Sequence, residues 1–200
     1  MSEFDSRARV WDHDKMHLDR SEAIAIELEK IIPADKSFKA LEYGAGTGIL
    51  SFALKDKLSG IVLMDSSREM IKVCQEKIEF FNISHIHPIW FDMEHDDYDG
   101  KFDIIYNQMV LHHVKNIDLI LGKFYNLLNP GGILVIADLY PEDGSFHGPE
   151  VDVHHGFDPE KLIEKLNKFG FYNGTYKTCF VVTRPNGLDY PVFFLASYKK

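Results

Sequence analysis

The chain alternates between short apolar runs and longer segments in which apolar residues recur at helical spacing. The apolar runs begin at residues 38, 60, 86, 102 and 133, and read FKALEY, GIVLM, IHPIWF, FDIIYN and ILVIADL. Runs that are almost continuously apolar are typical of strands whose two faces are both covered by helices, as in a parallel sheet. We therefore expect an open α/β sheet.

Capping residues set several boundaries between these elements. Ser66 and Glu69 have the spacing of a capping box, which predicts a helix over residues 67–81. The residues expected on the buried face of that helix are Ile71, Cys74, Ile78 and Phe81. A later helix is expected to begin at the Asp-Pro pair of residues 158–159 and to end at Gly170.

The two ends of the chain carry elements outside this alternating core. Phe4, Ala8 and Trp11 form a short amphipathic face, and a helix is expected from Ser21 to Ile32. Near the C-terminus, TYKTCFVVTR and YPVFFLASYK are joined by a short turn and predict an antiparallel hairpin. Before them, the polar sequence YPEDGSFHGPEVDVHHGF is long for a plain connection, which indicates a functional or mobile loop.

Length and composition fit one globular domain. The 200 residues are 45% hydrophobic and 26% charged, which excludes a disordered chain and does not require a second core. We expect an N-terminal helical cap over residues 1–35, a core over 36–139, and a substrate loop, helix and hairpin over 140–200. Cys74 and Cys179 lie in apolar stretches and are expected to be buried free thiols.

The charge pattern narrows the expected partners. The net charge is −9 and the basic residues are scattered, so no basic surface is available for the phosphates of nucleic acid. The N-terminal sequence MSEFDSRARVW is charged where a signal peptide is apolar, and no apolar run has the length that crosses a bilayer. We expect a cytoplasmic protein that acts on neither nucleic acid nor membrane.

The sequence LEYGAGTGIL, residues 41–50, carries the clearest chemical signal. A strand that leads into glycines at positions 44, 46 and 48 brings backbone close to a ligand, because no Cβ keeps the ligand away. The dinucleotide fingerprint G-x-G-x-x-G is not met, since its last position falls on Ile49 or Ser51. Glu42 comes just before the loop, where an acid repels a pyrophosphate and suits a cationic ligand.

This segment resembles the first motif of the class I S-adenosylmethionine-dependent methyltransferases, whose cofactor carries an ammonium and a sulfonium. The resemblance implies a doubly wound, Rossmann-like sheet of about seven strands in the order 3-2-1-4-5-7-6. It also implies S-adenosyl-L-methionine as cofactor, S-adenosyl-L-homocysteine as product and a small-molecule acceptor. The residues that it places beside the methionine portion of the cofactor are Glu42, Gly44, Ala45, Gly46 and Gly48.

Further motifs follow in the family's order, each at the end of an expected strand. The resemblance gives Asp65 the family's ribose role, and a carboxylate can accept hydrogen bonds from both ribose hydroxyls. Asn107 ends the fourth strand and is a further candidate for cofactor contact. The remaining residues that the resemblance places near the ribose or the adenine are Ser66, Met70, Asp92 and Met93.

The N-terminal sequence FDSRARVWD resembles a family pattern in which an aromatic residue folds over the cofactor. Trp11 is therefore a candidate to close the cofactor pocket and exclude water. The alternative is a helix that simply docks on the core.

Histidines are the candidates for contact with the methyl acceptor. Methyl transfer is an in-line displacement that requires alignment, and an acceptor hydroxyl also benefits from a general base. His113, His147 and His154, with the neighbouring His155, follow expected strand ends and are candidate bases or orienting donors. The alternative is that His112 or His113 packs in a helix and that the loop histidines face solvent.

No metal site is expected from the spacing of these residues. A metal held by His147, His154 and His155 with Glu150 and Asp152 is chemically conceivable, but the spacing matches no known ligand pattern. Two alternatives to a methyltransferase stay open. One is a non-catalytic S-adenosylmethionine-binding regulatory module, and the other is a nicotinamide oxidoreductase.

Overall fold

The computed structural model describes residues 3–148 and 150–200. Its strands form a seven-stranded sheet in the order β3-β2-β1-β4-β5-β7-β6, which confirms the expected fold and strand order. The strands are β1 (Lys39–Tyr43), β2 (Gly60–Asp65), β3 (Ile86–Trp90), β4 (Phe102–Gln108), β5 (Leu128–Leu139), β6 (Phe171–Thr183) and β7 (Asp189–Lys199). The helices are α1 (Glu3–Arg7), α2 (Lys15–Glu29), α3 (Ile49–Ala53), α4 (Arg68–Phe81), α5 (Ile117–Leu127) and α6 (Pro159–Phe169), with 3-10 helices η1 (Ala8–His13) and η2 (Leu111–His113).

The chain divides into two compact units, Met1–Asp96 and Asp97–Lys200. The expectation of a single domain over the whole chain stays a prediction. Among the described residues, no helix combines the length and the apolar character that crossing a membrane requires. Both cysteines are free thiols, but only Cys74 is buried as expected, since Cys179 is half-buried.

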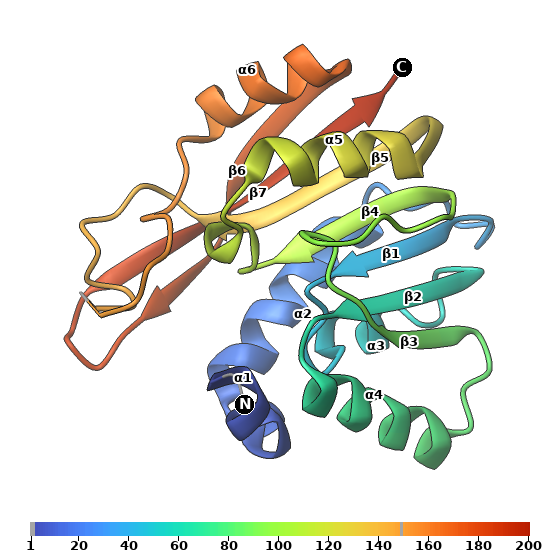
Figure 1. The fold of residues 1–200 in the computed structure, drawn as a ribbon, viewed down its shortest axis with the longest axis horizontal. Helices are drawn as coiled ribbons and strands as arrows, with labels where there is room; N and C mark the ends of the chain where they lie inside the picture. The colour runs from blue at the N-terminus through green and yellow to red at the C-terminus, as the bar shows by residue number, and fades with distance from the viewer. Residues whose placement is uncertain (1–2, 149) are drawn as a thin grey trace. The chain divides into compact units, whose positions relative to one another are not determined.

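The first unit contains three parallel strands, with β2 paired to both β1 and β3 (Figure 1). In register, Tyr43 lies beside Met64, and Asp65 lies beside Trp90. The C-terminal ends of the three strands therefore meet at one edge, as they do in any parallel sheet. β3 ends the strand order, which explains why it tolerates Pro88, a residue without a backbone N–H.

Helix α4 begins one residue later than the capping box predicts. Its N-cap is Ser67, whose hydroxyl accepts a hydrogen bond from the N–H of Met70, so the assignment of Ser66 to the cap is wrong. The N–H of Ser67 donates to Asp65 Oδ1 at 2.7 Å, which holds the start of the helix at the end of β2. Phe81 is also not on the buried face, since it is 61% exposed in the last turn.

Helix α2 begins at Lys15 and ends at Glu29, so the expected start at Ser21 and end at Ile32 are both wrong. Asp14 is its N-cap and accepts a hydrogen bond from the N–H of Met16 at 2.9 Å. The start was misplaced because the residues that this helix buries near its N-terminus are polar. The buried face consists of His17, Arg20, Ser21, Ile24, Ala25 and Leu28.

The second unit contains β4 and β5 in parallel, with β7 antiparallel to β5 and β6 antiparallel to β7 (Figure 1). The expected terminal hairpin is therefore confirmed. Helix α5 packs on β5, and α6 packs on β6 and β7. The expected limits of α6 are also confirmed, because Asp158 caps its first turn and Gly170 ends it with a φ of 100°.

The loop of residues 140–157 leaves the sheet and returns to it at the same place. The N–H of Phe157 donates to the carbonyl oxygen of Leu139 at 2.8 Å, and the N–H of Glu142 donates to that of His155 at 2.9 Å. Gly156 lies at this junction with a φ of 75°, and a Cβ there would lie 2.1 Å from the carbonyl oxygen of Tyr140. Glycine is therefore required where the two ends of the loop meet.

Candidate functional site

The loop between β1 and α3 has a left-handed backbone at three positions. Gly44, Gly46 and Gly48 have φ values of 65°, 55° and 78°, a region that residues with a Cβ rarely adopt. A Cβ built on Gly46 meets no described atom within 4 Å, whereas one built on Gly48 lies 2.9 Å from Leu63 Cδ1. Gly48 therefore serves the packing of the loop on β2, and Gly46 leaves open space that a ligand can approach.

Glu42, near the end of β1, is a completely buried acid. Its Oε2 accepts a hydrogen bond from Ser51 Oγ at 2.5 Å, and its Oε1 has no hydrogen-bond partner among the described residues. Burial raises the pKa of Glu42 to about 8, against the smaller opposing effect of the Ser51 hydrogen bond. The carboxyl group is therefore protonated at pH 7, and a nearby cation would favour its ionised form. This behaviour fits a cofactor that carries an ammonium group.

Asp65 ties the glycine loop to the end of β2. Its Oδ2 accepts the N–H of Gly46 and its Oδ1 accepts the N–H of Ser67, both at 2.7 Å, while the N–H of Ala45 donates to the carbonyl oxygen of Met64. Burial raises the pKa of Asp65, and these two backbone N–H groups oppose that effect. A carboxylate has about four acceptor positions. Two therefore stay available, which fits the two hydroxyls of a ribose.

Two predicted neighbours of Asp65 differ in their exposure. Ser66 is exposed, and its carbonyl oxygen accepts a hydrogen bond from Trp90 Nε1 at 2.9 Å. Met70 is almost completely buried in the first turn of α4. The contacts of both residues with a ribose or an adenine stay predictions.

Asp92 and Met93 follow β3 at the same edge as Asp65. The N–H of Phe91 donates to the carbonyl oxygen of Asp65 at 3.0 Å, which holds this segment beside the end of β2. Asp92 Oδ1 accepts the N–H of Glu94 at 3.0 Å, so its side chain stabilises a turn. Its carboxylate is still 41% exposed and retains acceptor positions, and Met93 is buried. The contacts of both residues with an adenine stay predictions.

Two aspartates of the sequence FDSRARVWD hold the N-terminal segment against these loops. Asp5 accepts a hydrogen bond from Ser67 Oγ at 2.6 Å. Asp12 accepts one from Thr47 Oγ1 in the glycine loop and forms an ion pair with Lys77 of α4. Lys77 also donates to the carbonyl oxygen of Thr47 at 2.8 Å. The sequence interpretation considered only the aromatic residue of this segment and missed both aspartates.

Trp11, the predicted lid residue, packs within the N-terminal segment. Its ring stacks on His17 with a centroid separation of 4.1 Å, and the guanidinium of Arg7 lies 4.8 Å from its centre. His17 Nδ1 lies 3.0 Å from the carbonyl oxygen of Trp11, and burial lowers the pKa of His17. The role of Trp11 in closing the cofactor pocket stays a prediction.

Asn107, in the second unit, is a completely buried amide near the end of β4. Its Nδ2 makes a long hydrogen bond, 3.4 Å, to the carbonyl oxygen of Val135. Its Oδ1 has no hydrogen-bond partner among the described residues. Leaving a buried acceptor unpaired is unfavourable, so Oδ1 is suited to receive a donor from a ligand.

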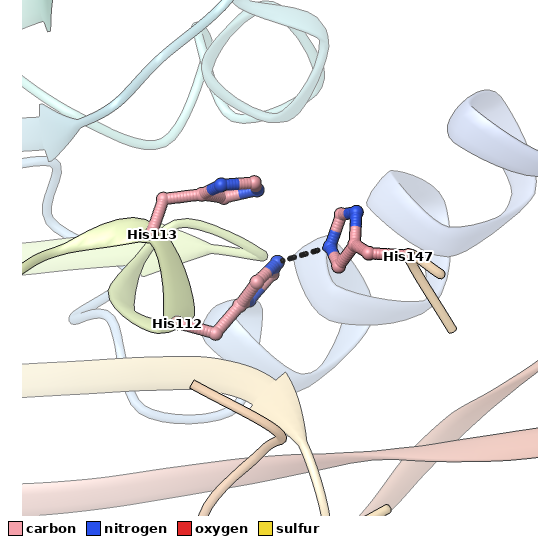
Figure 2. A group of neighbouring side chains, drawn as sticks. All are labelled: His112, His113 and His147. Atoms are coloured by element: carbon pink, nitrogen blue, oxygen red, sulfur yellow. Dashed lines mark hydrogen bonds between the residues drawn. The ribbon is translucent and has the colours of Figure 1, made fainter. Parts of the chain in front are cut away.

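A cluster of three histidines lies in the second unit, two from η2 and one from the loop after β5 (Figure 2). His112 Nε2 lies 3.0 Å from His147 Nε2. The ring centre of His113 lies 4.2 Å from that of His112 and 5.0 Å from that of His147. Burial lowers the pKa of His113 to about 3, helped by its two histidine neighbours, so its ring is neutral at pH 7. We call these three residues the histidine cluster.

Asp138 supports the cluster and was not among the predicted site residues. This acid is completely buried on β5, and its Oδ1 lies 2.6 Å from His112 Nδ1. It also accepts the N–H of Leu139 at 2.8 Å. In the sequence, Asp138 is the one charged residue in ILVIADL, and a lone acid in a buried strand is the signal that could have identified it.

His154 and His155 do not belong to this cluster. The N–H of His154 donates to the carbonyl oxygen of His112 at 2.8 Å, and its Nε2 lies 3.1 Å from that of Val114. His155 is exposed beside Gly144. Among the described residues, the histidine cluster is the group in which three or more side chains that could bind a metal lie close together. The set considered from the sequence, which combined loop histidines with Glu150 and Asp152, does not form such a group among the described residues.

A family model for a methyltransferase domain matches residues 34–169 of the chain. The chain belongs to the class I methyltransferases. Binding of S-adenosylmethionine and S-adenosylhomocysteine is typical of this family, and the residues around Gly46 and Asp65 fit such a ligand. The family assignment replaces the nicotinamide oxidoreductase alternative.

Known relatives support this class I methyltransferase assignment. An uncharacterized methyltransferase of Schizosaccharomyces pombe is 31% identical over 150 residues, which cover 66% of this chain and 53% of that protein. The chain spans about half the length of the curated relatives it matches.

Solved structures share the fold at low sequence identity. A complex of the Haloferax volcanii Trm112 methyltransferase activator with a methyltransferase matches with a TM-score of 0.76 and 15% identity, over 98% of both chains. A phosphoethanolamine N-methyltransferase of Haemonchus contortus, bound to phosphomonomethylethanolamine and S-adenosylhomocysteine, matches with a TM-score of 0.72 and 16% identity, over 90% of this chain and 52% of that one.

Proposed function

We propose that this class I methyltransferase binds S-adenosylmethionine through its first unit and transfers the methyl group to a small-molecule acceptor. The observation that carries the cofactor assignment is Asp65. Each of its oxygens accepts one backbone N–H, and the carboxylate retains positions for two hydroxyl donors. The open space beside Gly46 and the unpaired Oε1 of Glu42 support the same ligand.

The residues of the chain bind and orient in this proposal, and none forms a covalent bond. When bound, the cofactor supplies a methyl group on a positively charged sulfur. Asp65 holds the ribose, and the left-handed glycine loop lets the methionine portion approach the backbone. A bound ammonium group would favour the ionised form of Glu42, because a nearby cation opposes the effect of burial, which raises its pKa. Asp5 and Asp12 keep the N-terminal segment over these loops, which limits the access of water.

For the acceptor, we assign contacts to the second unit. His113 and His147 are half-buried, so each presents part of its ring to a ligand. The pKa of His113, about 3, makes it a weak base and suits it to orient the acceptor through a hydrogen bond. His154 serves to hold the loop on η2. A relative whose solved complex contains phosphomonomethylethanolamine supports an acceptor of small size.

The Asp65 assignment is tested by measuring the affinity for S-adenosylhomocysteine by calorimetry. Asp65→Ala removes hydrogen bonds to a charged group, each worth roughly 1.5–3 kcal/mol, so affinity is expected to fall at least about tenfold. Asp56→Ala is the control, because Asp56 is an exposed acid that pairs with its neighbour Lys55. An unchanged affinity in a folded Asp65→Ala variant would show that the ribose assignment is wrong.

Transfer itself is tested separately from binding. The protein is mixed with cofactor labelled in its methyl group and with pools of small hydroxyl and amine compounds, and labelled products are sought by mass spectrometry. A labelled product supports the proposal. Tight binding of the cofactor with no product from any pool favours the non-catalytic regulatory module.

A further inference from the structure

The histidine cluster directs three imidazoles from two separate segments toward one point. One nitrogen from each ring can be chosen so that all three lie within 4.8 Å of one another. His112 and His113 come from η2, and His147 comes from the loop that leaves β5 (Figure 2). A hydrogen-bonded relay needs only two such rings, so the convergence of three requires a further explanation.

A buried carboxylate fixes the orientation of His112, on the side of the ring opposite to His147. Asp138 Oδ1 lies 2.6 Å from His112 Nδ1, and Oδ2 lies 3.3 Å from the backbone N–H of His112. Because Asp138 accepts, Nδ1 carries the proton and Nε2 presents its lone pair toward His147. A carboxylate behind a histidine is the arrangement that orients histidine ligands in metal sites.

The spacing of the nitrogens suits a small cation. His112 Nε2 and His147 Nε2 are 3.0 Å apart. Two nitrogens bound to a tetrahedral ion at 2.0–2.1 Å are separated by about 3.3 Å, so only a small adjustment brings both into coordination. Without an ion, one of the two nitrogens must carry a proton and donate to the other.

The donor set selects the class of ion. Neutral imidazole suits zinc and the neighbouring divalent transition metals, whereas magnesium and calcium prefer oxygen ligands. His113 lies against both other rings, with its ring centre 4.2 Å from that of His112, so it can supply the third nitrogen. Asp138 adds one negative charge behind the site, and it partly balances the charge of a divalent ion.

We propose that His112, His113 and His147 together bind one divalent transition-metal ion, with Asp138 as the positioning residue for His112. Three protein ligands leave a fourth tetrahedral position, which takes water or a group of a bound small molecule. The site lies wholly within the second unit. It shares His113 and His147 with the proposed acceptor site, but metal binding is measured without methyl transfer, so the two proposals can fail separately. No ligand from the loop residues Glu150, Asp152 or His155 is needed.

The test measures metal binding directly on the full chain after treatment with a chelator. Zinc is titrated by calorimetry, and cobalt(II) is titrated while its visible absorption is recorded. We expect one equivalent of either ion to bind, with the intense ligand-field bands of a tetrahedral cobalt site. Lack of saturable binding at one equivalent would overturn the proposal and leave the cluster as hydrogen-bonded histidines.

Variants assign the ligands individually. His113→Ala and His147→Ala should each lower the zinc affinity more than about 100-fold, because each removes one of three ligands. His87→Ala is the control, since His87 is an exposed histidine on β3. Binding that survives either cluster substitution would overturn a three-histidine site, even if the wild-type chain binds zinc.

Asp138→Asn tests the positioning role. Loss of a supporting carboxylate typically weakens metal binding about 10- to 100-fold, and the cobalt spectrum should shift as His112 changes its orientation or tautomer. The folded state of the variant is checked by circular dichroism. An unchanged zinc affinity and cobalt spectrum would show that Asp138 has no positioning role for a metal ligand.

Discussion

At the scale of single residues, Glu42 is the most informative position in the first unit. A carboxyl group without solvent contact is unfavourable in its ionised form, and burial accordingly raises its pKa to about 8. Its motif position was recognisable in the sequence, because an acid just before the glycine loop is a local pattern. Its protonated state was not, since that depends on how completely the surrounding residues exclude water.

Glu42 predicts a specific dependence of stability on pH. Its folded pKa, about 8, is above the ordinary value of 4.5, so between these values the folded state holds a proton that the unfolded state has released. This contribution to stability is complete below the ordinary pKa and is lost as pH rises through about 8, by on the order of 5 kcal/mol at most. Melting temperatures from pH 5 to pH 9 should fall more in the wild-type chain than in Glu42→Gln. Parallel pH profiles for the two proteins would contradict the assignment.

The glycines of the loop should separate binding from stability. Gly46→Ala adds a Cβ into open space at a φ of 55°, so it should cost about 1–2 kcal/mol of stability and mainly weaken cofactor binding. Gly48→Ala adds the same strain plus a contact at 2.9 Å with Leu63 Cδ1, and overpacking costs roughly 1–3 kcal/mol more. Urea unfolding and calorimetric titration with S-adenosylhomocysteine measure both effects. If the two variants lose cofactor affinity in the same proportion to their loss of stability, Gly46 has no separate role in binding the ligand.

At the scale of secondary-structure elements, the N-terminal segment was recognised from its sequence, but the start of the helix that follows it was misplaced. The pattern FDSRARVWD predicted a segment that folds over the cofactor, with simple docking on the core as the alternative, and this stays a prediction. Asp5 and Asp12 tie the segment to the loops after β1 and β2. The start of α2 was misplaced because His17, Arg20 and Ser21 are buried polar residues. Hydrophobic periodicity does not detect a helix whose buried face is polar.

The tether through Asp12 should control the mobility of this segment. Asp12→Ala removes the acceptor for Thr47 Oγ1 and the ion pair with Lys77. Amide hydrogen exchange in residues 3–13 should become several-fold faster, because opening of the segment then breaks fewer contacts. Asp19→Ala is the matched control, since it removes an exposed pair with Lys15 on α2. Equal exchange in both variants would show that Asp12 does not hold the segment.

At the scale of the whole molecule, the sheet was predictable and the histidine cluster was not. The strand order came from the family resemblance and is confirmed, and the positions of Asp65 and Asp92 follow from motifs that lie at strand ends along the chain. The approach of His147 to His112 joins residues 35 positions apart, and it depends on the path of a loop whose described residues form no helix or strand. No local pattern encodes that path, so the sequence suggested His154 and His155 as readily as His113 and His147, and it gave His112 no role in a site.

Replacing the interior of this loop should leave the rest of the molecule intact. A chain in which a short Gly-Ser linker replaces residues 143–154 retains the residues whose backbone closes the base of the loop, Leu139, Glu142, His155 and Phe157. Loop-closure entropy changes slowly with length, but the replacement also removes Phe146, which is buried beside Tyr190. Losing a buried phenylalanine costs about 3–5 kcal/mol, so the melting temperature should fall by roughly 10 °C, and cofactor affinity should persist. Zinc binding should disappear with His147. Global unfolding of this variant would show that the loop interior is part of the core.

The closed base of the loop has a consequence for how relatives of this protein diverge. Because Gly156 and the backbone bonds around it fix both ends of residues 140–157, we expect insertions or exchanges between those ends to strain β5 and α6 little. The segment thus forms a replaceable cassette, and the chemistry it contributes can evolve separately from the glycine loop and Asp65. Selection for a new acceptor can act on the cassette while the recognition of the methyl donor stays constant.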